Sequence, residues 1–287
     1  MSTRSGRNES RSYYSGNSRS GDSRGNNRSG NNPSKKKKNR RSPVGKAVLS
    51  LILTLAIGVF LISGLKLISI LTTYKEAEDA YKTITQTVAV MPTDSEKDYP
   101  EIDFNSLLAM NPQTKGYIFI KDVLEYPFVQ GTDNETYLHT MLNGEYNPSG
   151  TLFIDCNIPE GVDAKNCIIY GHNMNDGSMF SSLYKYSDPE FYDAHRYVHI
   201  YTPEHHYLYK VVSAYTADVD GFTYTYNFPD DEAFTEFQKQ TLLQSWFNSD
   251  TELTPDDKMI TLSTCVNSGD EQYRNVVVLV RDSEITE

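Results

Sequence analysis

Thr261-Leu262-Ser263-Thr264-Cys265 is a short β-type run that ends on a cysteine. About ninety residues upstream, a second β-type run, Ile168-Ile169-Tyr170-Gly171, leads into His172. Arg274 follows the cysteine by nine residues and opens the valine-rich run Val276–Val280. Each of the three polar side chains lies at the end of a predicted strand. Because the thiolate is the reactive form of cysteine and nearby cations favour it, this pattern indicates a cysteine nucleophile site.

Working outward from this site, the chain shows many short β-type runs separated by turn residues. This pattern is typical of a closed or sandwich all-β architecture, so the fold class is predicted to be mainly β. The predicted strands cover residues 116–120, 126–129, 150–154, 166–170, 197–201, 207–215, 258–263 and 275–281. Apolar residues at helical spacing predict helices over residues 74–88, 104–110 and 230–248.

The charge of the chain is distributed very unevenly. The formal net charge is -11, but residues 1–46 carry +11 and residues 47–287 carry -22. Residues 1–46 are rich in Ser, Gly, Asn and Arg, a composition that buries too little apolar surface to fold, so they are predicted to form a disordered basic tail. The basic run from Lys35 to Arg41 has two interpretations, a nucleic-acid patch or the flank of a membrane helix. Its position favours the membrane flank, and we expect no nucleic-acid partner.

A membrane segment follows the basic tail directly. Residues 47–65 form an uncharged run of 19 residues, which as a helix would span roughly 28 Å, close to the thickness of a bilayer core. Apolar residues extend the run to Leu71. A cleaved signal peptide is the alternative, but its apolar core is shorter and no small-residue cleavage site follows here. We therefore predict a transmembrane helix over residues 47–71, a cytoplasmic N-terminus and an extracellular remainder.

The chain has three cysteines, too few and of the wrong parity for a disulfide framework. Cys156 and Cys167 lie beside or within apolar runs, so burial as small hydrophobic residues is the simpler interpretation. A disulfide between these two remains open at this point. The sequence contains no Cys and His spacing that is typical of a zinc site, and we predict neither a metal nor a cofactor.

Several blocks of the sequence resemble one family of enzymes. The chain resembles a class B sortase, a membrane-anchored cysteine transpeptidase of Gram-positive bacteria. The resemblance covers residues 105–281 and rests on Tyr126–Gln130, Asp133-Asn134, Gly150–Asp155, Tyr170–Met174, Gly177–Phe180, Leu183–Tyr186, Thr261–Cys265 and Arg274. The run Thr-Leu-x-Thr-Cys with an upstream Gly-His is typical of all sortases. Ser263 before Thr264 and the long insertion with a helix before the cysteine strand are typical of class B.

The resemblance implies a sortase-like closed eight-stranded β-barrel with peripheral helices, preceded by the single transmembrane helix. It implies that Cys265 attacks the carbonyl after Thr in a C-terminal sorting signal and forms a thioacyl enzyme. His172 then exchanges protons with the leaving and incoming amines, and Arg274 hydrogen-bonds the oxyanion or the substrate. Ser263 and Thr264 are implied to contact substrate. The predicted partners are surface proteins bearing sorting signals, an amino group of a peptidoglycan precursor, and the membrane.

The predicted organisation has four parts. Residues 1–46 form the tail, residues 47–71 the transmembrane helix, residues 72–100 a helical linker and residues 101–287 the catalytic domain. Asn111-Pro112-Gln113-Thr114 resembles a sorting signal that some class B enzymes recognise, but its position predicts a turn between a helix and a strand.

Three alternatives to a wall-anchoring sortase remain at this point. A pilin-polymerising sortase usually has a second hydrophobic segment near its C-terminus, and the residues before Glu287 contain none. A hydrolytic, papain-like cysteine peptidase would place its cysteine before its histidine and on a helix, the reverse of the order here. A membrane-tethered binding module without catalysis would not need all three polar residues. The sequence leaves open the sorting motif and the identity of the amine acceptor.

Overall fold

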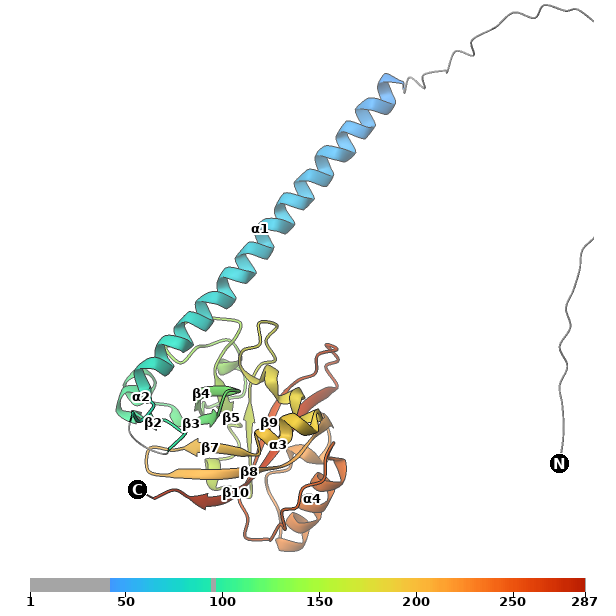
Figure 1. Ribbon diagram of the computed structural model, residues 1–287. Coiled ribbons are helices and arrows are strands. Elements are labelled where there is room, and N and C mark those ends of the chain that lie inside the picture. Colours follow the sequence, from blue (N-terminus) through green and yellow to red (C-terminus); the bar gives the residue numbers. More distant parts are fainter. Residues whose placement is uncertain (1–41, 94–96, 287) are drawn as a thin grey trace, which may run out of the picture. The chain divides into compact units, whose positions relative to one another are not determined.

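The structure is a computed structural model that describes residues 42–93 and 97–286. The chain divides into two compact units, residues 1–57 and residues 58–287, and every strand found in the described residues belongs to the second (Figure 1). The predicted disordered tail, residues 1–46, falls mostly outside the described residues. Residues 43–46 form the first turn of a helix.

Eight strands close into a barrel in the order β10-β8-β7-β3-β4-β5-β6-β9. All eight were predicted from the sequence, and the mainly β, eight-stranded barrel is confirmed. Their bounds are β3 Thr114–Ile120, β4 Leu124–Val129, β5 Leu152–Ile154, β6 Asn166–Tyr170, β7 Tyr197–Tyr201, β8 His206–Asp218, β9 Met259–Cys265 and β10 Tyr273–Glu284. A separate two-stranded sheet, not predicted, joins β1 Ala89–Val90 to β2 Glu101–Ile102.

Two of the neighbouring strand pairs in the barrel are parallel. β4 pairs with β5 and β6 pairs with β9 in parallel, whereas the other pairs are antiparallel. The β6–β9 pair matters for function, because parallel strands bring their carboxyl ends to the same edge of a sheet. The residues that follow β6 therefore lie beside the last residues of β9.

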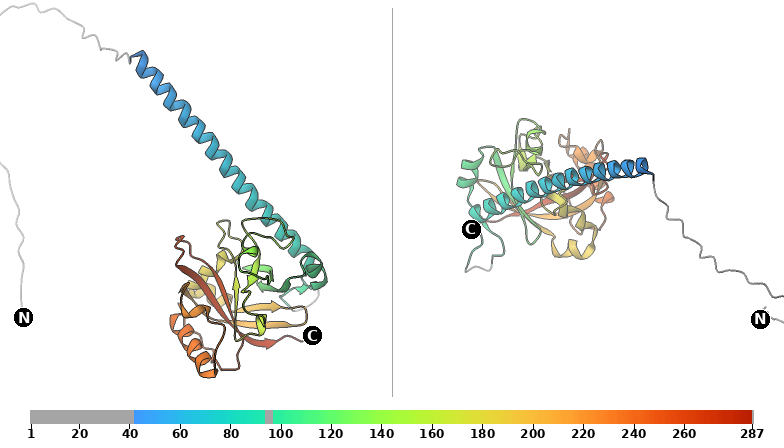
Figure 2. Two further views of the ribbon diagram at one scale, coloured as in Figure 1. Left: turned by 180° about the vertical axis from the view of Figure 1, so that it is seen from behind. Right: turned by 90° about the horizontal axis from the view of Figure 1, so that it is seen from above.

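Helices and 3-10 turns surround the barrel. The helices are α1 Pro43–Val88, α2 Phe104–Met110, α3 Pro189–Ala194 and α4 Asp231–Gln244, and the 3-10 segments are η1 Thr136–Leu138, η2 Gly161–Asp163, η3 Phe180–Ser187 and η4 Phe222–Tyr224. Helix α2 matches the predicted bounds, and α4 ends four residues before the predicted Asn248. Asp230 caps α4 by accepting a hydrogen bond from the Ala233 amide at 2.8 Å. Helices α2 and α4 lie on opposite sides of the barrel (Figures 1 and 2).

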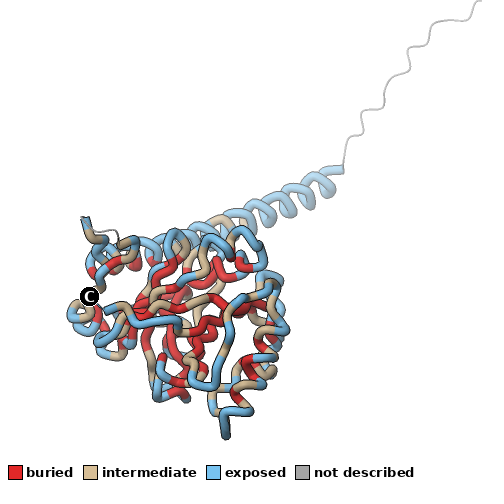
Figure 3. The backbone as a smooth tube through the Cα atoms, turned by 60° about the horizontal axis from the view of Figure 1, so that its bottom comes forward, coloured by how far each residue is buried: buried red, intermediate tan, exposed pale blue. Residues whose placement is uncertain are grey.

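The strand β10 is buried on both of its faces. Val277 and Leu279 belong to the main core, whereas Val276, Val278 and Val280 pack in a second core with residues of α4. Because successive side chains of a strand point to opposite faces, a continuous apolar run indicates that both faces are covered. Helix α4 supplies that cover with Phe234 and Phe237. In Figure 3 the buried residues gather inside the barrel unit, whereas the long helix is mostly exposed.

The last turns of α1 belong to the barrel unit, and their buried residues are Ala77, Tyr81, Ile84 and Val88. The Tyr81 hydroxyl donates to the Gly150 carbonyl at 2.6 Å and shares a hydrogen bond with Thr151 Oγ1 at 2.9 Å. This confirms the predicted helix over residues 74–88. By length and composition, α1 could also cross a membrane, since its most apolar window has a mean hydropathy of 2.6 and contains no buried residue. The predicted boundary at residue 101 between linker and catalytic domain stays a prediction.

Candidate active site

The parallel register of β6 and β9 brings His172 next to Cys265. Tyr170, the last residue of β6, pairs with Ser263 of β9, and the Gly171 amide donates to the Ser263 carbonyl at 3.1 Å. The Asn173 side chain donates to the Cys265 carbonyl at 2.8 Å, so the segment that contains His172 runs alongside the end of β9. Two residues separated by more than ninety positions in the sequence are thus neighbours at one edge of the barrel.

Gly171 is required where the chain leaves β6. A Cβ atom at this position would clash with the side chain of Leu152 and would lie 2.7 Å from Cδ2 of the Phe180 ring. Real Cβ atoms do not approach other atoms so closely, so any larger residue would push the segment away from the core. Because His172 is the next residue, this close packing fixes the path of its backbone. The Gly-His pair of the sequence therefore has a steric basis.

Arg274 lies directly opposite Cys265 in the antiparallel β9–β10 pair. Residues that face each other across such a pair have side chains on the same face of the sheet. The Arg274 guanidinium is held by Nη1, which donates to the carbonyls of Glu271 at 2.8 Å and Tyr273 at 2.9 Å. Among the described residues, the hydrogen bonds of this guanidinium use only Nη1. Its Nε and Nη2 donors therefore stay available to a ligand.

The His172 ring is fixed by a backbone carbonyl and by a second histidine. Its Nε2 lies 2.7 Å from the Leu138 carbonyl oxygen, and its ring stacks on His139 with 5.8 Å between centroids. A carbonyl only accepts, so we assign the hydrogen of the neutral imidazole to Nε2, which leaves the lone pair on Nδ1. Burial lowers the pKa of His172, the Leu138 carbonyl opposes this, and His139 lowers it further. The neutral imidazole is therefore favoured near neutral pH.

Asn173 connects the segment after His172 to the end of β9. Its side-chain nitrogen donates to the Cys265 carbonyl at 2.8 Å and to Asn267 Oδ1 at 2.5 Å. Asn173 also forms an isolated β-bridge with Met179. These contacts hold the two chain segments of the site together. In the sequence, Asn173 is only one residue of the Tyr170–Met174 block, and nothing there predicts this role for it.

Ser263 and Thr264 lie next to the cysteine but are buried. Ser263 Oγ shares a hydrogen bond with the Tyr224 hydroxyl at 2.9 Å, and the buried Thr264 hydroxyl has no partner among the described residues. Burial raises the pKa of Tyr224, whereas Ser263 and Arg274 lower it and Cys265 raises it. Tyr224 thus lies within electrostatic range of both Cys265 and Arg274. No local sequence pattern marks Tyr224, because it comes from the insertion that ends before β9.

The three cysteines differ sharply in their exposure. Cys265 is exposed, Cys156 is half-buried and Cys167 is buried, and all three are free, so the open question of a Cys156–Cys167 disulfide is answered by two separate thiols. Burial raises the pKa of Cys167, which keeps its thiol protonated and unreactive. Across residues 42–93 and 97–286, no cluster of three or more His, Cys, Asp or Glu side chains is arranged to hold a metal ion.

Known proteins match this chain over most of its length. A model of the sortase domain family matches residues 122–282. Sortase B of Listeria monocytogenes is 33% identical over 241 residues, which are 81% of this chain and 96% of that protein. Sortase B of Staphylococcus aureus is 28% identical over 238 residues, covering 82% and 97% of the two chains.

Solved structures of sortases share the fold. A structure of sortase B from Bacillus anthracis in complex with AAEK1 superposes with a TM-score of 0.63 at 30% identity, covering 74% of this chain and 98% of that one. A sortase B–substrate complex from Staphylococcus aureus gives a TM-score of 0.59 at 29% identity, covering 64% and 85%. With its closed eight-stranded barrel and a histidine and an arginine beside an exposed strand-end cysteine, the chain belongs to the sortase family of cysteine transpeptidases, in the class of sortase B.

Proposed function

We propose that this protein cleaves the C-terminal sorting signal of surface proteins after Thr and transfers them to an amino group of the cell wall. Sortases of this kind act on sorting-signal substrates with amine nucleophiles, and the family assignment supports the same reaction class here. One observation carries the residue assignment. Arg274 pairs with the exposed Cys265 in the β9–β10 register, and the β6–β9 register brings the segment after Tyr170 to the same end of β9, which supports the assignment.

In the first half-reaction, Cys265 is the nucleophile. Its proton passes to Nδ1 of His172, the nitrogen that the Leu138 contact leaves free, and the thiolate sulfur bonds to the carbonyl carbon of the substrate Thr. Negative charge develops on the carbonyl oxygen, where the free donors of Arg274 stabilise it. The bond from carbon to nitrogen then breaks, and the leaving amine takes the proton back from His172. The products are a thioacyl enzyme and the released C-terminal fragment.

In the second half-reaction, an amine replaces the cysteine. The amine nitrogen attacks the thioester carbonyl and gives a proton to His172, and the cysteine sulfur leaves and recovers its proton. Ser263 and Thr264 contribute to substrate binding through the wall beneath the cysteine, where Ser263 holds the Tyr224 hydroxyl in place. A solved structure of sortase B in complex with triglycine supports a peptide amine as the acceptor class.

The proposed location follows from α1 and from the basic residues that precede it. We propose that residues 47–71 cross the membrane, with the N-terminus in the cytoplasm and the barrel outside. The basic run Lys35–Arg41 lies on the side that the positive-inside rule assigns to the cytoplasm. The exposed apolar residues of α1 before Thr72 support a lipid environment for this part of the helix.

The residue assignment is tested with three active-site variants and one matched control. We expect Cys265→Ala to abolish both cleavage of a sorting-signal peptide and formation of the thioacyl enzyme, measured by mass spectrometry. His172→Ala and Arg274→Ala should each lower kcat/KM by about 10²–10³-fold or more, since each removes a proton-transfer or oxyanion contact. Cys156→Ala, a half-buried cysteine elsewhere, should retain activity. Full activity of Cys265→Ala would disprove the assignment.

Product analysis distinguishes transfer from hydrolysis. The wild-type enzyme is given a sorting-signal peptide library with and without a peptide amine such as triglycine. A transpeptidase yields the amide-linked product when the amine is present. Free acid alone, at saturating amine, would mean that the chain is a hydrolytic cysteine peptidase.

A further inference from the structure

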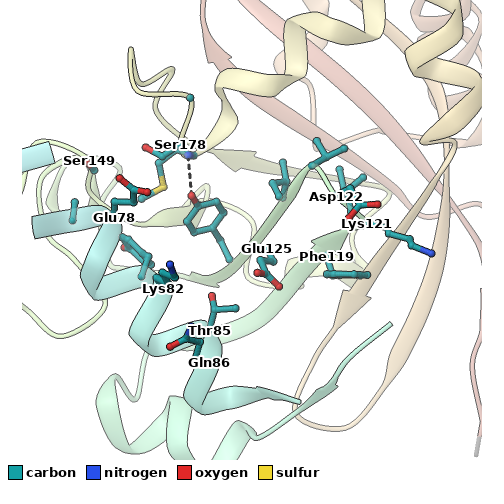
Figure 4. A pocket seen from close by; sticks show the side chains of 18 of the residues that line it. Glu78, Lys82, Thr85, Gln86, Phe119, Lys121, Asp122, Glu125, Ser149 and Ser178 are labelled. Carbon is teal, nitrogen blue, oxygen red and sulfur yellow. Dashed lines mark hydrogen bonds between the residues drawn. The ribbon is translucent and has the colours of Figure 1, made fainter. Parts of the chain in front are cut away.

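Residues 177–179, in the segment that follows His172, line a cavity. It encloses about 690 Å³ and is walled by α1, by the β3–β4 hairpin and by residues 177–179 (Figure 4). All of these walls belong to the barrel unit. The cavity shares the segment that holds Asn173 and Met179 with the active site, but it contains none of the residues assigned to catalysis.

The charge of the cavity is unbalanced. Its lining includes four carboxylates, Glu78, Asp98, Asp122 and Glu125, but only two ammonium groups, Lys82 and Lys121. Lys121 is already paired with Asp98 at 3.1 Å. Within residues 42–93 and 97–286, Glu78 and Glu125 form no ion pair with a cation. Burial raises the pKa of Glu125, which is what a carboxylate without a counter-ion shows when its water is partly removed.

The cavity also offers hydrogen-bonding groups that are not in use. The Ser149 side chain is 2% exposed, and its hydroxyl has no partner in the described part of the chain. A buried polar group without a partner is costly, so this hydroxyl indicates a missing ligand atom. The Tyr126 hydroxyl accepts a hydrogen bond from the Met179 amide at 3.2 Å, and its own hydrogen remains free to donate. Figure 4 shows Ser149 and Glu78 at one end of the cavity and Glu125 further along it, on the side of the β3–β4 hairpin.

We propose that this cavity is a second binding site, which takes a peptide segment carrying a positively charged amino or guanidinium group. The excess of carboxylates attracts the cation, and Ser149 and the Tyr126 hydroxyl bind the peptide's polar atoms. This inference rests on the proposed function, because that reaction has two cationic peptide reactants. One is the peptide amine that accepts the surface protein, and the other is the basic tail that often follows a sorting signal.

Occupancy of the cavity would be sensed at the active site. The Tyr126 hydroxyl holds the Met179 amide, Met179 bridges to Asn173, and the Asn173 side chain holds the Cys265 carbonyl. Met179 has a φ of 55°, a backbone conformation that costs energy for a residue with a side chain. Tyr81 of α1 packs edge-on against Tyr126 with 5.3 Å between ring centroids. A ligand that contacts Tyr126 is therefore linked to Cys265 through Met179 and Asn173.

Binding is measured on the full-length chain in detergent micelles, in the Cys265→Ala background so that no thioacyl enzyme forms. The probes are triglycine, N-acetyl-triglycine and a tetra-arginine peptide amide. Binding of each probe is measured by saturation-transfer NMR and by calorimetric titration. We expect the charged probes to bind and the acetylated peptide to bind at least about tenfold more weakly, because it lacks the cation. Preference for triglycine identifies the acceptor as the occupant, and preference for tetra-arginine identifies the basic tail.

Variants locate the binding to this cavity. Glu125→Gln and Glu78→Gln should each weaken the preferred charged probe by about tenfold, whereas Glu236→Gln on α4 should leave its affinity unchanged. Thermal unfolding is measured for each variant, and Glu125→Asp, which keeps the charge, should retain most of the binding if Glu125→Gln is poorly folded. Equal affinity for the charged and acetylated probes, or unchanged affinity in both glutamine variants, would overturn the proposal. Peptide cleavage by the wild-type enzyme without added amine tests the proposed function separately.

Discussion

The residues of the site differ in how strongly their surroundings constrain them. Cys265 ends its strand and is exposed, so its thiol is open to substrate. His172 is half-buried between a carbonyl and a second imidazole, and this gives it one preferred tautomer. Arg274 is held by two carbonyls but keeps donors free. The proposed nucleophile is accessible while its two proposed partners are already oriented, which is the arrangement that electrostatic preorganisation requires.

The titration of His172 is the first prediction at this scale. Because burial and His139 both lower the pKa of His172, we expect it to titrate below the ordinary value of about 6.5. Since the unfolded chain then binds this proton more tightly, His172 contributes stability above pH 6.5 that is lost as the pH falls below it. NMR of labelled imidazoles in the Cys265→Ala background measures the pKa directly.

His139→Asn provides the matched comparison for this titration. It removes the stacked ring and its charge, and the pKa of His172 should rise toward the ordinary value as a result. A pKa of His172 above 6.5 in the parent, or a lower pKa in His139→Asn, would contradict this account of the site.

The elements show why distant segments are needed to build one site. The residues after β6 lie beside the end of β9 only because these two strands run parallel, and β10 brings Arg274 opposite Cys265 only in its antiparallel register. A shift of one residue in either register would turn the side chains to the other face. The valine-rich run of β10 is therefore as important as the polar residues, because burial on both faces fixes its register.

Helix α1 provides a prediction at the scale of elements. Tyr81 is 4% exposed and its hydroxyl bonds to Gly150 and Thr151. Tyr81→Phe removes only the hydroxyl and should cost about 1–3 kcal/mol of unfolding free energy. Tyr81→Ala also leaves a cavity and should cost about 3–5 kcal/mol. Chemical denaturation followed by circular dichroism gives both values, and equal values for the two variants would mean that the ring does not pack as described.

At the scale of the whole molecule, the two ends of helix α1 differ in their surroundings. Its apolar N-terminal part is exposed, whereas its last turns carry residues that are buried in the barrel core. The proposed division at residue 101 assigns those last turns to a linker. Their burial leads us to expect that the barrel needs part of residues 72–100 in order to be stable.

Two truncations test this expectation. A chain starting at Thr72 should be soluble and folded, since it lacks the apolar segment but keeps Ala77, Tyr81, Ile84 and Val88. A chain starting at Glu101 loses these four residues, each worth about 1–3 kcal/mol, and their sum approaches the total stability of a typical domain. We expect it to unfold at a much lower temperature or to aggregate. Equal melting temperatures for the two chains, measured by calorimetry, would support the boundary at residue 101 instead.

The amino-acid sequence by itself predicted the eight strands that the structure confirms, and it supplied the proposals for the membrane segment and for the three polar residues of the site. These features depend on local order: alternating or continuous apolar runs, an uncharged stretch of sufficient length, and a family pattern around Cys265. The Gly-His pair is also a local signal. The reason for its glycine, however, is the close packing of Gly171 against Phe180, which only the folded structure shows.

The tertiary structure alone decided which residues meet. Tyr224, Leu138 and His139 reach the site from segments with no local mark of function, because a barrel joins elements that lie far apart along the chain. The cavity behind Met179 likewise needs a helix, a hairpin and a loop in one place. Burial, ring stacking and unpaired charge depend on which segments come into contact. The local order of residues does not show which segments these are.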